Sequence, residues 1–140
     1  MKGSHLYRLF VYGSLRSGFK SPAYEYISRY FRFVCDAKVK GKLYDLGEYC
    51  AGITSDDDGF IIGELYEIKD EGEFSWAIAQ LDDYEGIHVE SDEMQLYRRE
   101  IADAHHENET TSAWIYWYNG DVANKPVVSS GDILDYLKNK

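Results

Sequence analysis

The stretch from Leu9 to Gly18 reads LFVYGSLRSG, and it says more about the fold than any other part of the chain. Residues 6–12 are apolar and rich in aromatic side chains, which predicts a β-strand. We expect the strand to stop at Gly13 and Ser14, where a basic, glycine-containing segment follows. Gly13 lets the backbone adopt conformations closed to other residues, and it leaves space for a ligand beside the main chain.

The turn after this strand is a candidate anion site. Successive backbone amides at such a turn can point into one concavity and bind a carboxylate or a phosphate. Many strands also end in Gly-Ser at a tight turn that binds nothing, so the residues alone leave both interpretations open.

Length and composition predict one folded domain over residues 1–140, since a chain of 140 residues is long enough to bury a core. The 44% apolar content is that of a globular protein, and the 13 tyrosines predict strands and a lined cavity. A net charge of −10 argues against binding of nucleic acid or of an anionic membrane, because both reward a basic face. The balance favours a small-molecule ligand.

The N-terminus has no long apolar segment of the kind found in signal peptides, and no run approaches membrane-spanning length. We therefore expect a cytoplasmic protein in which Cys35 and Cys50 are reduced thiols. The sequence leaves the oligomeric state open.

The spacing of apolar residues predicts the first helix and the strands that follow it. A short helix is expected to begin at Pro22, and one or two strands are expected between Phe33 and Leu46. The strand from Phe60 to Lys69 alternates so that residues 62, 64, 66 and 68 share one face. Gly63 lies inside that strand and predicts a bulge or bend of the kind that a closing barrel needs.

A second chemical element is predicted between Glu73 and Gly86. Residues 74, 77, 78 and 81 recur at helical spacing and form one apolar stripe, and Glu85 falls near the middle of the same stripe. A carboxyl group aimed inward at the C-terminal end of a helix is favoured in its protonated form by the helix dipole and by burial. Glu85 is therefore a candidate general acid/base, although a frayed last turn would direct it to water instead.

The C-terminal part is expected to be strand-rich. Arg99 to Ala104 reads as a strand, His105 to Glu109 as the polar tip of a hairpin, and Ala113 to Tyr118 as the strongest strand in the chain. An extended piece and a terminal helix follow from Val127. The two adjacent histidines have no further ligand cluster, so we expect no metal site there.

Several motifs together resemble the gamma-glutamyl cyclotransferase-like superfamily, in particular its AIG2-like and gamma-glutamylamine cyclotransferase branch. The segments VYGSLRSG at residues 11–18 and LDDYEG at residues 81–86 are similar to the opening motif and the catalytic motif of this superfamily. Three further segments match in order: GELYEI at 63–68, Tyr97-Arg98-Arg99, and the strand at 113–118. In the loop signature at 44–52, Cys50 takes the place of a proline that is common in the family.

This resemblance implies an α+β fold, a small and mostly antiparallel β-barrel with a few flanking helices. It further implies release of 5-oxoproline and a free amine from a gamma-glutamyl amine or amino acid, with Glu85 as the catalytic residue. The implied substrate-binding residues are Tyr12, Gly13, Ser14, Leu15 and Tyr116, with no metal or cofactor. The alternative is a module of the same fold that binds a small ligand or regulates without turnover.

Overall fold

The computed structural model describes residues 7–12, 22–46, 50–55, 59–84, 97–120, 122–128 and 130–138. Along the chain, its elements are β1 (Arg8–Val11), α1 (Pro22–Tyr30), β2 (Phe31–Lys40), β3 (Lys42–Asp45), β4 (Cys50–Ile53), β5 (Phe60–Ile68), η3 (Glu71–Glu73), α2 (Phe74–Tyr84), β6 (Tyr97–His106), β7 (Glu109–Tyr118) and α3 (Ile133–Lys138).

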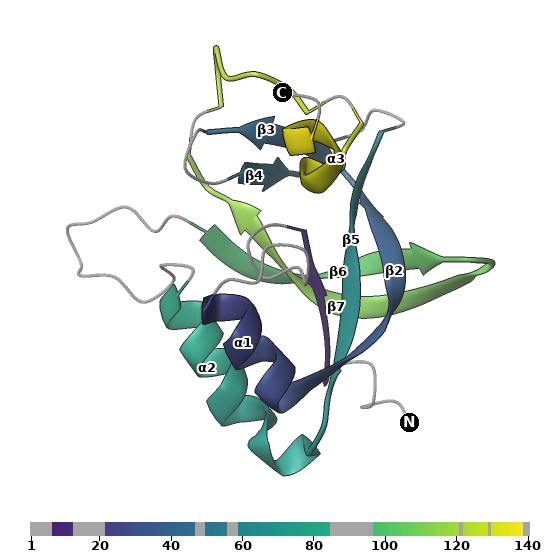
Figure 1. The fold of residues 1–140 in the computed structure, drawn as a ribbon, viewed down its shortest axis with the longest axis vertical. Helices are drawn as coiled ribbons and strands as arrows, with labels where there is room; N and C mark the ends of the chain where they lie inside the picture. Colours follow the sequence, from purple (N-terminus) through teal and green to yellow (C-terminus); the bar gives the residue numbers. More distant parts are fainter. Residues whose placement is uncertain are drawn as a thin grey trace.

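Five strands close into a barrel in the order β1-β5-β2-β6-β7. All of its pairings are antiparallel except β1 with β7, which meet in parallel at Leu9 and Trp114. A separate two-stranded sheet, β3-β4, lies with α3 beyond one end of the barrel, and α1 and α2 lie side by side at the other end (Figure 1). The predicted α+β barrel fold is confirmed.

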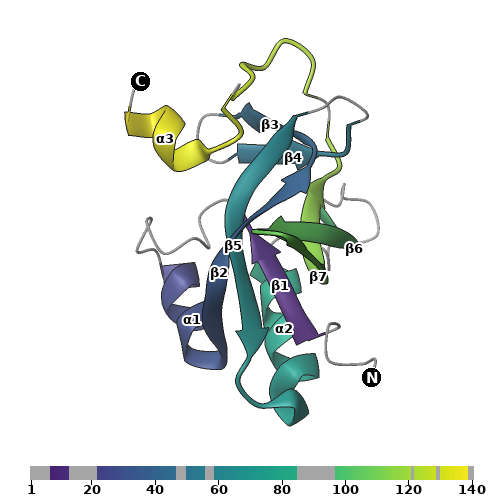
Figure 2. The same cartoon turned by 90° about the vertical axis from the view of Figure 1, so that its right-hand side faces the viewer.

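The two faces of the barrel strands belong to two separate clusters of buried residues. One cluster contains residues of α1 and α2, so it lies between the barrel and the helices, and we call it the helix-side cluster: Leu9, Val11, Ile27, Phe31, Tyr66, Ile68, Phe74, Ala77, Ile78, Leu81, Tyr97 and Tyr116. The other, the barrel-interior cluster, takes the alternate strand residues and is closed at one end by Leu43, Val128 and Ile133. Figure 2 shows α1 beside β2 and β1 beside β5.

The predicted apolar stripe of α2 is confirmed, because all four of its residues are buried in the helix-side cluster. The predicted alternation of β5 is also confirmed. Tyr66 and Ile68 face the helices, whereas Ile61 and Leu65 face the barrel interior. The helix itself is described as far as Tyr84, so the predicted end at Gly86 lies outside the described residues.

The bulge predicted at Gly63 is in the wrong strand. Gly63 pairs regularly with Ala37, and the register shift lies in β2 between Phe33 and Cys35. Gly63 instead allows a close approach of β1. A Cβ atom added there would lie 2.2 Å from the carbonyl oxygen of Val11 and 2.7 Å from the Phe10 ring.

Two other expectations need correction. The strand segment predicted from Phe33 begins at Phe31 and divides into β2 and β3 at Gly41. His105 and His106, predicted at a hairpin tip, belong to β6, since cross-strand pairing continues to the pair of His106 with Glu109. The turn is therefore shorter than expected.

The close approach at Gly63 yields a stability prediction. Gly63→Ala should lower the free energy of unfolding by about 1–3 kcal/mol, because the methyl group meets backbone that cannot move independently. Gly59→Ala is the matched control, since a Cβ atom there would lie 3.7 Å from its nearest neighbour, the carbonyl oxygen of Gly41. Urea unfolding of the two variants measures the difference, and equal losses would contradict this account of Gly63.

Candidate functional site

Of the predicted site residues, the structure describes Tyr12 and Tyr116, while Gly13, Ser14, Leu15 and Glu85 lie outside the described residues. The elements that lead into these four are described. Tyr12, which follows β1, directly precedes Gly13 in the sequence, and α2 ends at Tyr84, directly before Glu85. The described residues nearest to these four positions show how the flanking elements are held.

Tyr12 joins three segments that are far apart in the sequence. Its hydroxyl donates a hydrogen bond to the carbonyl oxygen of Tyr116 and accepts one from the backbone N–H of Gly52 at 3.2 Å. Only 5% of Tyr12 is exposed, so these bonds form away from water, where they are strong and costly to lose. The end of β1 is thereby fixed to β7 and β4.

Gly52 is part of the same contact. A Cβ atom at this position would lie 2.7 Å from Cζ of Tyr12, so the phenol ring rests directly on the backbone of β4. The family resemblance implied substrate binding for Tyr12 and gave no indication of this tie. A glycine inside a short strand is the sequence signal that indicates such a close backbone approach.

Tyr116 contributes differently with its backbone and its side chain. Its carbonyl receives the Tyr12 hydroxyl, whereas its side chain is buried in the helix-side cluster together with Val11 and Leu81. Leu81 precedes Glu85 by four positions, and Val11 precedes Gly13 by two. The segments that lead to the two predicted chemical motifs thus belong to one packed cluster.

Glu64 on β5 is a buried carboxylate on this same face. It is 5% exposed and lies opposite Val11 in the register of β1 with β5. The hydroxyl of Tyr66 donates a hydrogen bond of 2.9 Å to Glu64 Oε1. The alternation of the sequence places Glu64 on the same face as Ile62, Tyr66 and Ile68, which is the signal of a buried carboxylate.

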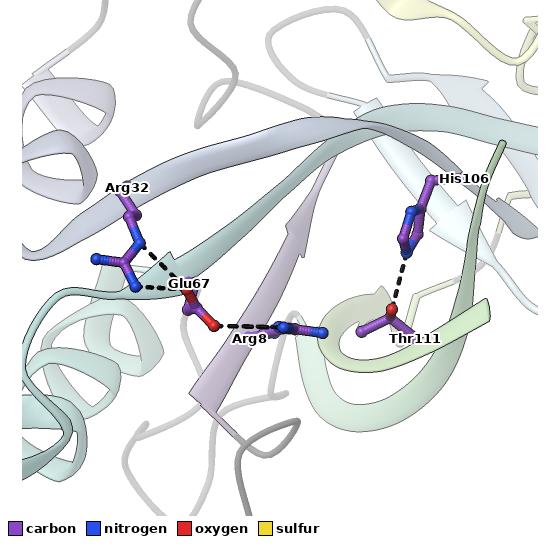
Figure 3. A network of polar contacts seen from close by, with 5 residues as sticks. All are labelled: Arg8, Arg32, Glu67, His106 and Thr111. Atoms are coloured by element: carbon purple, nitrogen blue, oxygen red, sulfur yellow. Dashed lines mark hydrogen bonds and ion pairs between the residues drawn. The ribbon is translucent and has the colours of Figure 1, made fainter. Parts of the chain in front are cut away.

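A second group of polar side chains involves the ends of β1, β2 and β5 (Figure 3). Glu67 accepts hydrogen bonds from Arg32 at 2.7 and 3.1 Å and from Arg8 at 3.4 Å. Chiefly through the Arg32 hydrogen bonds, the pKa of Glu67 is held below its usual value despite partial burial. The network therefore stabilises the fold at neutral pH, and its contribution is lost as the pH falls through the lowered pKa.

Figure 3 also shows His106, whose Nε2 lies 2.8 Å from the Thr111 hydroxyl oxygen across the β6–β7 hairpin. Cys35 is a free thiol, and burial raises its pKa, with Glu107 and Asp36 adding to the effect. Within the described ranges, no three His, Cys, Asp or Glu side chains gather to hold a metal ion. None of the helices in that part of the chain is long and apolar enough to cross a membrane.

The order of the motifs and the barrel geometry agree with one known family. The sequence profile described as "Gamma-glutamyl cyclotransferase, AIG2-like" matches residues 9–135. The chain belongs to this family. No curated protein matches the sequence significantly.

Solved structures show the same fold. An AIG2-like protein from Mus musculus superimposes with a TM-score of 0.66 at 22% identity, over 91% of this chain and 89% of the other. YtfP from Escherichia coli superimposes with a TM-score of 0.63 at 28% identity, over 95% of this chain and 99% of the other. YkqA from Bacillus subtilis superimposes with a TM-score of 0.65 at 27% identity, over 95% of this chain, which spans 42% of the length of YkqA.

The Tyr12 contact yields the second prediction. Tyr12→Phe should cost about 1–3 kcal/mol of stability, because it removes a hydroxyl that is bonded to two buried backbone groups. Tyr26→Phe, the control, should cost less. The Tyr26 hydroxyl also bonds a carbonyl, that of Ala77 at 3.1 Å, but it is only part-buried and water can replace it. Thermal melting compares the two, and an equal or larger loss for Tyr26→Phe would refute the proposed role of the Tyr12 tie.

Proposed function

We propose that this protein is a cyclotransferase that converts a gamma-glutamyl amine or gamma-glutamyl amino acid into 5-oxoproline and a free amine. The match of the family profile over residues 9–135 carries the proposal, because that range includes both motifs with chemical groups. The packing of Val11, Leu81 and Tyr116 in one cluster supports it, since the segments that lead to both motifs share that cluster.

The proposed reaction is an intramolecular aminolysis. The nitrogen of the substrate's α-amine forms a bond to its own γ-carbonyl carbon, and the bond from that carbon to the leaving nitrogen breaks. An ammonium group is not a nucleophile, so a base must first take its proton. Glu85 takes that proton and returns it to the leaving nitrogen, which restores the starting state of the carboxyl group. The second proton that the attacking nitrogen loses on forming the lactam ends on the released amine, which leaves as its ammonium ion. The proton balance needs no metal and no cofactor.

In this proposal, the loop after β1 orients the substrate. Backbone amides of Gly13, Ser14 and Leu15 bind the α-carboxylate and fold the substrate into the geometry of attack, which provides much of the rate. Tyr12, tied to β7 and β4, holds the first end of this loop in place. Tyr116 forms part of the wall near the loop.

The test of Glu85 is the sharpest. Glu85→Gln keeps the size of the side chain but cannot accept the ammonium proton, so turnover should fall by at least about 10²–10⁴-fold while the fold and substrate binding persist. 5-Oxoproline release from gamma-glutamyl amines, gamma-glutamyl amino acids and glutathione measures turnover, with a melting curve for each protein. Glu71→Gln, an exposed carboxylate in η3, is the control and should retain activity.

Near-normal turnover of Glu85→Gln would remove Glu85 from the mechanism. A wild-type protein that binds gamma-glutamyl compounds but releases no 5-oxoproline would instead support the alternative, a ligand-binding module of the same fold.

A further prediction concerns the loop. Gly13→Val should weaken substrate binding more than Ser14→Ala, because the new side chain would occupy the position of the anion, whereas the contacts come from backbone amides. Substrate affinity of the two variants is the measurement. A larger loss from Ser14→Ala would show that the hydroxyl group, rather than the backbone, binds the carboxylate.

A further inference from the structure

A cavity of about 240 Å³ lies at the end of the barrel where Figure 1 shows β3, β4 and α3. Three segments form its walls: the turn from β2 into β3, the start of β5, and the segment that follows β7. The lining residues are Gly41, Lys42, Leu43, Gly59, Phe60, Val127, Val128 and Gly131. The proposed reaction gives a role to none of them, so the cavity is a separate feature of the fold.

The walls of the cavity are held in place by backbone hydrogen bonds. The N–H of Val128 donates to the carbonyl oxygen of Leu43 on β3 at 2.8 Å. The carbonyl oxygen of Gly131 accepts a bond of 2.8 Å from the N–H of Ile62 on β5. Because the segment after β7 is thereby fixed to two different strands, it cannot move inward to fill the space.

The same kind of bond determines the chemistry of the lining. The N–H groups of Gly41, Val128 and Gly131 all donate to carbonyl oxygens of the protein, so they are not offered to an anion. Lys42, the one charged residue of the lining, already has an interaction partner. The other lining residues are glycines and apolar side chains. A charged ligand would therefore lose its water and gain little in exchange, which is costly.

Two further side chains narrow the choice of ligand. The ammonium group of Lys38 lies 4.5 Å from the centroid of the Phe60 ring, so a cation beside this ring would meet a like charge. Val127 is 45% exposed although it is apolar. An apolar ligand in the cavity covers part of this side chain, and removing apolar surface from water is favourable.

The volume sets the size of the ligand. Apolar cavities of about 150 Å³ hold benzene, so the larger cavity in this protein has room for a ring with a substituent. We propose that the cavity binds a small uncharged aromatic compound, one ring with a short alkyl group, between the end of the barrel and the segment after β7. The inference goes beyond the proposed function and does not depend on it.

Toluene is the probe for this site, and benzoate and benzylammonium are charged compounds of similar size. Titrations of the full chain are followed by saturation-transfer NMR, with a melting curve for each compound. Toluene should bind and raise the melting temperature, since it binds the folded state. Both charged compounds should bind at least about tenfold more weakly. No binding of toluene would overturn the proposal, and a charged compound that binds as tightly as toluene would overturn the chemical class.

A substitution at the edge of the cavity tests the location. Val127→Phe places a ring there and should weaken toluene at least about tenfold, because the new side chain occupies part of the space. Ile101→Phe is the matched control. Ile101 on β6 is 47% exposed and does not line the cavity, so its replacement should leave the affinity unchanged.

Val127→Ala tests the same contact even if Val127→Phe does not fold. It removes two methyl groups from the wall and should weaken toluene by a smaller factor. Wild-type affinity in a folded Val127 variant would overturn the assignment of toluene to this cavity. The measurement does not use catalysis, so the inference can fail while the proposed function stands.

Discussion

The hydrogen bonds of one buried phenol tie the barrel strands β1 and β7 to β4 of the separate two-stranded sheet. The Tyr12 hydroxyl is bonded to the backbone of β7 at Tyr116 and of β4 at Gly52, positions separated by 104 and 40 residues along the chain. Ordering such distant segments costs conformational entropy, and bonds formed out of water help to offset it. Gly13 therefore follows directly on a residue whose position is determined by contacts with two other strands. The proposed backbone anion site needs that rigidity, because its donors cannot adjust by rotating side chains.

The two faces of the barrel strands pack against different partners. The interior face packs small and branched residues such as Ala113 and Ile115 against Leu65, and this packing closes the barrel. The outer face is covered by α1 and α2, whose contact is made by Tyr26, Tyr30 and Trp76. The buried stripe of α2 fixes the rotation of the helix as far as Tyr84. Tyr66, with its bond to Glu64, lies on this helix-side face, whereas Tyr12 belongs to the barrel-interior cluster.

The sequence predicted the parts of the fold that depend on local periodicity. The stripe of α2 and the alternation of β5 follow from burial on one side, and both are confirmed. The errors concern long-range pairing. Gly63 was predicted to carry a bulge, but its reason for being glycine is the Val11 carbonyl on another strand, which no local pattern reveals. His105 and His106 were predicted to lie in a turn because they are polar, although cross-strand pairing extends β6 through both.

The same distinction applies to the site. Glu64 and Glu67 are three residues apart on one strand and face opposite sides, so alternation alone could separate them. Their partners could not be predicted, because Arg8 and Arg32 come from strands on either side of β5, and only the register brings both to Glu67. Arg8 and Arg32 hold Glu67 as a carboxylate on the partly exposed face of β5. Glu64 lies on the buried, helix-side face of the same strand and accepts a hydrogen bond from Tyr66. Two glutamates of one strand thus differ in burial and in hydrogen-bond donor because they lie on opposite faces of β5.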